Sequence, residues 1–117
     1  MIRRLALATL LLPGAVAAQQ ATSVGTGEFR VLDKVTGQLA ELSLAVGETG
    51  SVGTLQVRMN DCRVPTDNPT GDAYAELDVT DRDDPTPVFS GWMIASAPAL
   101  NAMDHPRYDV WVMSCGS

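Results

Sequence analysis

Apolar and polar residues alternate along several short stretches of the chain, a period of two that is typical of β-strands with one buried face. The clearest stretch is 38–46, where one face carries four aliphatic side chains: Ala40, Leu42, Leu44 and Val46. Similar patterns recur downstream as far as the C-terminus. Together they predict six strands, over residues 29–32, 38–46, 54–60, 73–79, 88–94 and 108–115.

The segments between these strands are rich in turn-forming Gly, Pro, Asp, Asn and Ser. No segment has a convincing helical period, and at most one short helical turn fits, near 97–103. Six strands separated by frequent turns favour an all-β fold, a compact antiparallel sandwich or barrel. The last predicted strand, 108–115, has apolar residues on both of its faces, which is typical of a central strand.

Residues 1–18 differ from the rest of the chain. A basic start with Arg3 and Arg4 precedes an apolar run, 5–12, and small residues end the segment. This order predicts a signal peptide, cleaved after Ala17 or Ala18, and therefore export. A buried first helix is the alternative, but no capping residue closes it and a Pro-Gly pair interrupts it.

The length of 117 residues allows one domain. We expect residues 19–27 to be a flexible lead-in and residues 28–117 to form a single β domain. The chain has 14 acidic and 8 basic residues, with a net charge of −6, and removal of the signal peptide would leave 99 residues at −8. This acidity argues against a nucleic-acid partner. No apolar run of 18 residues follows the first twenty, so no transmembrane span is expected after cleavage.

The chain has two cysteines, Cys62 and Cys115, and an even count in an exported domain favours a disulfide between them. A redox-active pair would need closer spacing at a helix start. The alternation of the preceding strand, continued to position 62, would place Cys62 on the outward face. We therefore expect the strand to end or bulge near Asp61, so that the thiol can turn toward its partner.

The most unusual stretch lies between residues 89 and 109, and it supplies a candidate interaction surface: Trp92, Asp104, His105, Arg107, Tyr108 and Asp109. A catalytic interpretation would join Ser90 or Ser96 to His105 and an Asp. No Gly-x-Ser-x-Gly elbow supports that interpretation. A structural corner is favoured, in which Asp104 caps a turn and Arg107 pairs with Asp109.

The sequence offers two candidate metal sites and favours neither. Asp81, Asp83 and Asp84 could offer oxygens to calcium, but the strict calcium-loop pattern is missing, which leaves a solvated turn. His105 with four methionines could suggest a soft metal, although scattered methionines are more often core residues: Met59, Met93, Met103 and Met113. The sequence predicts no metal and no cofactor.

Several motifs resemble those of a family of small exported bacterial proteins, domain of unknown function 2155: Phe89-Ser90-Gly91-Trp92-Met93, Ala95-Ser96-Ala97-Pro98-Ala99-Leu100, and His105-Pro106-Arg107-Tyr108-Asp109-Val110-Trp111-Val112 with Cys115. Earlier matches are Leu32 to Gly37, the turn Val46-Gly47-Glu48, Asp61-Cys62-Arg63 and Asp72 to Ala75. Ala97 departs from the pattern, which often has a second Ser there, and this weakens a catalytic role for Ser96. The resemblance implies a periplasmic location and brings no established activity, cofactor or catalytic residue.

These observations predict a non-enzymatic interaction or structural module of the cell envelope, with an envelope protein as partner. The alternative is a small-ligand or metal-binding protein, or a weak hydrolase, centred on His105. A close approach of Ser96 Oγ to a ring nitrogen of His105 would support a hydrolase, and a separation beyond about one bridging water would count against catalysis.

Overall fold

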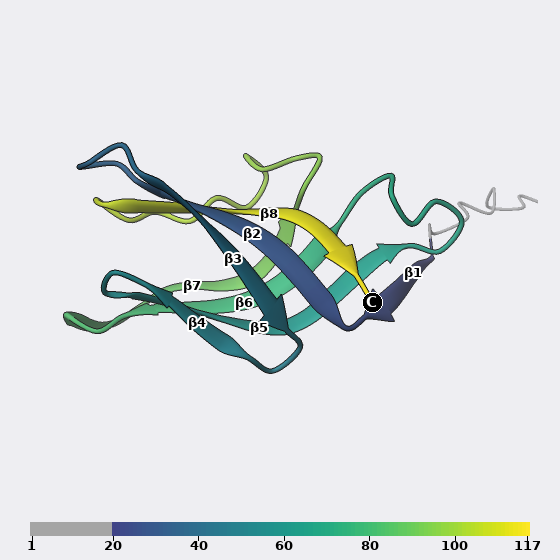
Figure 1. Ribbon diagram of the computed structural model, residues 1–117, viewed down its shortest axis with the longest axis horizontal. Coiled ribbons are helices and arrows are strands. Elements are labelled where there is room, and N and C mark those ends of the chain that lie inside the picture. The colour runs from purple at the N-terminus through teal and green to yellow at the C-terminus, as the bar shows by residue number, and fades with distance from the viewer. Residues whose placement is uncertain (1–19) are drawn as a thin grey trace, which may run out of the picture.

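The computed structural model describes residues 20–117, and the predicted signal peptide lies outside them (Figure 1). The described residues form two antiparallel sheets that face each other as a compact sandwich, without any helix, which confirms the predicted fold class. None of their segments is thus a helix that could cross a membrane. The eight strands are β1 (Ala21–Val24), β2 (Thr26–Asp33), β3 (Leu39–Ala45), β4 (Thr49–Val52), β5 (Leu55–Pro65), β6 (Tyr74–Asp81), β7 (Asp84–Ile94) and β8 (Tyr108–Gly116).

The larger sheet has the strand order β1-β5-β6-β7, and β4 pairs with the first part of β5. Because β1 pairs only with the last part of β5, the two short strands share one side of this long strand. The smaller sheet has the order β3-β2-β8. Side chains at alternate positions of both sheets point between them and form the core, in which Phe29, Leu55, Met59 and Leu77 are fully buried.

The structure has two strands more than the sequence predicted. Residues 21–24, expected to belong to a flexible lead-in, form β1 because β5 continues to Pro65 and offers them a backbone partner. Residues 49–52, expected to be a turn, form β4 in the same way. The segment 80–87 is mostly strand, since β6 and β7 are joined by a turn of only Arg82 and Asp83. The prolines of β7 are tolerated because β7 is an edge strand.

The expectation that the last strand is central was wrong. β8 pairs with β2 alone and is therefore an edge strand of the smaller sheet. Its inward residues, Val110 and Val112, are buried between the sheets. Its other apolar residues, Trp111 and Met113, line a hollow beside the connection from β7 to β8. The apolar residues on both faces of β8 are therefore explained by this hollow, and not by a second neighbouring strand.

The predicted disulfide between Cys62 and Cys115 is confirmed, with 5.7 Å between the two Cα atoms, and it joins β5 of one sheet to β8 of the other. The predicted irregularity near Asp61 is also present, since the pairing of β5 with β6 shifts between Met59 and Asp61. Beyond this shift Cys62 faces inward and is fully buried. A second shift in the pairing of β2 with β8 leaves Met113 as an extra residue, so that Cys115 also faces inward.

The two long sides of the sandwich differ. On the β3–β4 side, Leu42 and Leu44 pack so closely on Gly50 that a Cβ atom there would lie 2.7 and 2.8 Å from their methyl carbons. On the other side, β7 and β8 are edge strands of different sheets, and the chain from 95 to 107 crosses between them (Figure 1). This second side is where the sandwich is open.

Candidate functional site

His105 is held by hydrogen bonds at both ring nitrogens. Its Nδ1 accepts the backbone N–H groups of Arg107, at 3.0 Å, and Tyr108, at 3.1 Å. Because an accepting nitrogen carries no proton, the neutral ring bears its proton on Nε2, which donates to the Asp81 carboxylate at 2.9 Å. The His105 and Asp81 side chains are only 11% and 10% exposed. The imidazole therefore ties the chain before β8 to the end of β6.

Asp81 is well suited to hold the imidazole as a carboxylate. The backbone N–H of Asp83 donates to it, and together with the bond from His105 this lowers the pKa of Asp81 below its ordinary value. A carboxylate stabilised in this way stays ionised at neutral pH and remains an acceptor. Two of the three acidic residues weighed for calcium, Asp81 and Asp83, thus shape the β6–β7 hairpin.

Arg107 and Lys34 tie the same segment to the other sheet. The Arg107 guanidinium makes a two-pronged contact with Asp33, with the shortest distance 2.9 Å, and this lowers the pKa of Asp33 to about 2. Lys34 Nζ donates to the His105 carbonyl at 2.6 Å and lies 3.7 Å from Asp109. The expected pairing of Arg107 with Asp109 is therefore replaced by two pairs with the β2–β3 hairpin, which lies alongside in space.

The segment 104–109 thus closes one end of the sandwich. The hairpins β2–β3, β4–β5 and β6–β7 and the start of β8 all lie at this end, at the left of Figure 1. The Tyr108 ring lies 5.4 Å from the His105 ring, and its hydroxyl occupies the space that a Cβ atom would need at Gly53, which has a φ of 58°. The predicted structural corner is a clamp between hairpins of both sheets. We call residues 104–109 the end clamp.

The structure does not bring Ser96 and His105 to a common carboxylate. The Ser96 hydroxyl donates to Asp72 at 2.6 Å, and the Ser96 backbone N–H donates to the same carboxylate at 3.0 Å. Asp72 precedes β6, whereas Asp81, the partner of His105, ends it. Burial raises the pKa of Asp72, but the Ser96 hydroxyl and two backbone amides outweigh it and the pKa lies below its ordinary value. The Asp72–Ser96 contact fastens the loop before β6 to the chain after β7.

Trp92 lies apart from the other five candidate surface residues. It lies on the edge strand β7 and pairs with Glu76 of β6, which is five residues along that strand from Asp81, or about 17 Å at the rise of a strand. The Arg63 guanidinium lies over its ring, 4.9 Å from the centroid. The end clamp holds the other candidates, namely Asp104, His105, Arg107, Tyr108 and Asp109.

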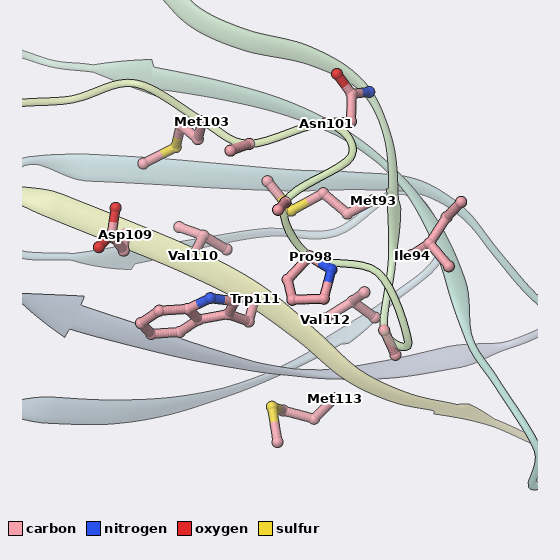
Figure 2. Close-up of a pocket in the computed structure, with 13 residues that line it drawn as sticks. Met93, Ile94, Pro98, Asn101, Met103, Asp109, Val110, Trp111, Val112 and Met113 are labelled. Carbon is pink, nitrogen blue, oxygen red and sulfur yellow. The ribbon is translucent and has the colours of Figure 1, made fainter.

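A groove that the sequence did not predict lies on the open side of the sandwich, between β7, the chain at 95–103, and β8 (Figure 2). Its volume is about 440 Å³, and mostly apolar side chains line it: Met93, Ile94, Pro98, Met103, Val110, Trp111, Val112 and Met113. Asn101 supports its outer wall by donating from its side-chain amide to the Trp92 carbonyl at 2.7 Å. Asp109 lies at one end of the groove and links it to the end clamp.

A second hollow of about 340 Å³ continues along the same strand. It shares Ala95 and Met113 with the apolar hollow and extends past Ser114 to Cys115. Its lining is more polar and includes Asp72, Ser96 and Thr70. Together the two hollows border β8 from Asp109 to Cys115. We call this continuous depression the β8 groove.

The candidate metal ligands named from the sequence make other contacts in the structure. Within residues 20–117, no three or more His, Cys, Asp and Glu side chains are grouped as metal ligands. Three of the four methionines weighed with His105 are buried in the core, and Met113 borders the β8 groove. The methionines thus contribute apolar surface to the core and the groove.

Comparison with known proteins gives a family without an assigned activity. A relative in Rickettsia prowazekii (strain Madrid E), an uncharacterized protein, is 29% identical over 92 residues. These residues are 76% of this chain and 59% of the relative, so the chain spans about three fifths of the relative's length. No solved structure matches the chain significantly. Residues 27–115 match the family described as an uncharacterized protein conserved in bacteria, DUF2155, and the chain belongs to this family.

Proposed function

We propose that this chain is an exported periplasmic protein that acts without catalysis, as an interaction module of the cell envelope. The observation that carries the proposal is the β8 groove, whose apolar hollow of about 440 Å³ lies on the open side of the sandwich. Apolar concave surfaces framed by polar groups are typical of binding sites. The partner surface that we propose is this groove, which includes Asp109 among the candidate surface residues.

The bonding of His105 favours binding over catalysis. A general base needs a free lone pair that can reach a substrate proton. The lone pair of Nδ1 accepts two backbone N–H groups, and Nε2 donates to Asp81. Ser96, the nucleophile considered with it, donates to Asp72 instead. Both side chains thus make contacts within the fold: His105 joins the end clamp to the end of β6, and Ser96 joins the chain after β7 to the loop before β6.

The disulfide supports the proposed compartment. Disulfides persist in the periplasm and other oxidising compartments, and small exported domains depend on them more than large ones do. The bond between Cys62 and Cys115 joins two sheets that are otherwise held by side-chain packing across the core. Export would therefore supply the conditions in which this fold is most stable. Fractionation should release a shortened chain without free thiols from the periplasm.

Photo-cross-linking in living cells tests the proposed function. A benzophenone amino acid in place of Met113, which is 44% exposed and borders the groove, should form an adduct with one envelope protein. The same amino acid at the exposed Thr80 of β6, which lines neither hollow, is the matched control and should not form it. Absence of any adduct from position 113, or the same adducts from both positions, would contradict the proposal.

A further inference from the structure

We propose that the β8 groove binds an extended polypeptide segment that adds to the smaller sheet as a strand beside β8, with apolar side chains at alternate positions and basic residues at its ends. This inference rests on the proposed function and names the chemistry of the partner. Four features carry it: the free edge of β8, the course of the groove, its lining and its charge.

The first feature is the backbone of β8. This strand pairs with β2 on one side only. Within the described residues 20–117, the chain at 95–104 makes backbone hydrogen bonds with β7, with Ala73 and within itself, and none with β8. An unpaired strand edge presents a row of N–H and C=O groups that another extended backbone can pair with. The edge of β7 is protected by Pro85 and Pro87, whereas β8 contains no proline.

The second feature is the course of the groove. Its two hollows border β8 continuously from Asp109 to Cys115, seven residues or about 23 Å of strand. A rounded ligand would fit a broad pocket, whereas this depression is elongated along β8. The chain at 95–103 forms the opposite wall (Figure 2). An extended segment of about seven residues matches this length.

The third feature is the lining, which fits alternating side chains. Met103, Pro98 and Trp111 surround the apolar hollow at one end, and Ser96 and Thr70 border the polar hollow at the other. A strand lying in the groove points every second side chain to the same side. The side chains directed into the apolar hollow would be aliphatic or aromatic, because burying an unpaired polar group there is costly.

The fourth feature is charge. The residues that line the two hollows include two carboxylates, Asp109 near one end and Asp72 near the other, and they include no Lys or Arg. Lys34, outside the lining, lies 3.7 Å from Asp109, so the charge of Asp72 is the more available of the two. Asp72 is ionised at neutral pH because its hydrogen bonds lower its pKa. The chain as a whole is acidic, with a net charge of −6. Basic residues that flank the apolar part of the partner would complement this negative charge, and acidic residues there would be repelled by it.

Selection from a displayed library of random twelve-residue peptides against the full chain tests the inference. The selected peptides should alternate apolar residues, carry Lys or Arg at the flanks and lack internal proline. Bound peptide should slow hydrogen exchange of backbone amides in 109–115. Replacing the central apolar residue of a selected peptide by proline, or its flanking basic residues by Glu, should weaken binding roughly tenfold or more.

Two variants of one loop provide the matched control. Ala102→Trp fills the apolar hollow from an exposed position on its wall and should abolish peptide binding. Leu100→Trp adds a similar bulk two residues away, at a side chain that is 72% exposed and does not line the groove, and should leave binding unchanged. Thermal unfolding of both variants confirms that they fold. Equal binding by both, protection of strands other than β8, or no selected peptide at all would overturn the inference.

The two proposals fail separately. If position 113 captures an envelope protein in cells but that complex leaves the β8 amides unprotected, the strand-addition inference is wrong and the interaction function stands. If position 113 captures nothing in cells, the proposed function is wrong whatever the peptides do.

Discussion

Removal of the disulfide should cost this protein a large part of its stability. The bond joins residues 53 positions apart, so it closes a long loop in the unfolded chain. In the chain-entropy description a loop of this length stabilises the folded state by about 4 kcal/mol. Domains of this kind are typically stable by only about 5–15 kcal/mol. The double variant Cys62→Ala/Cys115→Ala should therefore be folded but marginal at room temperature.

Equilibrium unfolding in urea measures this cost. The midpoint should fall by an amount that corresponds to about 4 kcal/mol. Since alanine also removes two sulfur atoms from the interior, the reduced wild-type chain serves as a second comparison that keeps its sulfur and lacks only the bond. A loss below about 1 kcal/mol in both proteins would refute the loop-entropy reasoning. A large loss in the alanine variant alone would assign the stability to packing instead.

Three further substitutions test contacts that hold the sandwich together. Gly27→Ala places a Cβ atom 2.7 Å from the Met59 sulfur, 2.8 Å from the Cys62 sulfur and 3.0 Å from the Phe29 ring, and should cost about 1–3 kcal/mol in thermal unfolding. An unchanged melting temperature would contradict this. The pKa of Asp33 is about 2 in the folded state, below its ordinary 3.8, so its contact with Arg107 stabilises the fold above about pH 4 and is lost as the pH falls toward 2. Arg107→Ala should therefore flatten the acid side of the plot of stability against pH. An unchanged midpoint of acid unfolding would contradict this role of the contact. His105→Ala removes the Nδ1 acceptor of the part-buried Tyr108 amide bond and should cost about 1–3 kcal/mol by urea unfolding. A neutral result would mean that the hydrogen bonds of His105 add no stability.

Local alternation was enough to predict most of the sheet core. The inward residues expected in 54–60 and 73–79 are buried, because a period of two reports burial directly when one face of a strand is covered. The irregularity near Asp61 was predictable for a related reason, since Cys62 had the wrong parity for a residue that must reach a partner. The strands β1 and β4 escaped prediction because they are held by the edge of β5 and not by a pattern of their own.

The site depended on contacts that no local pattern contains. The partners of His105 and Arg107 lie 24 and 74 positions away in the chain, in hairpins that only the folded sandwich brings together. One feature of the sequence did indicate the groove, namely the apolar residues on both faces of the strand 108–115. That signal has two physical explanations, a central strand or an edge strand beside a hollow, and only the strand order distinguishes them.

The bulges of β5 and β8 tie the disulfide to the strand registers of both sheets. Each cysteine faces inward only because its strand contains one extra residue before it. A slip of one residue in either strand would turn one thiol toward solvent and out of bonding range. In the folded sandwich the two sulfur atoms therefore meet only when both strand registers are correct. Once formed, the bond fixes the register of each sheet together with the position of one sheet on the other.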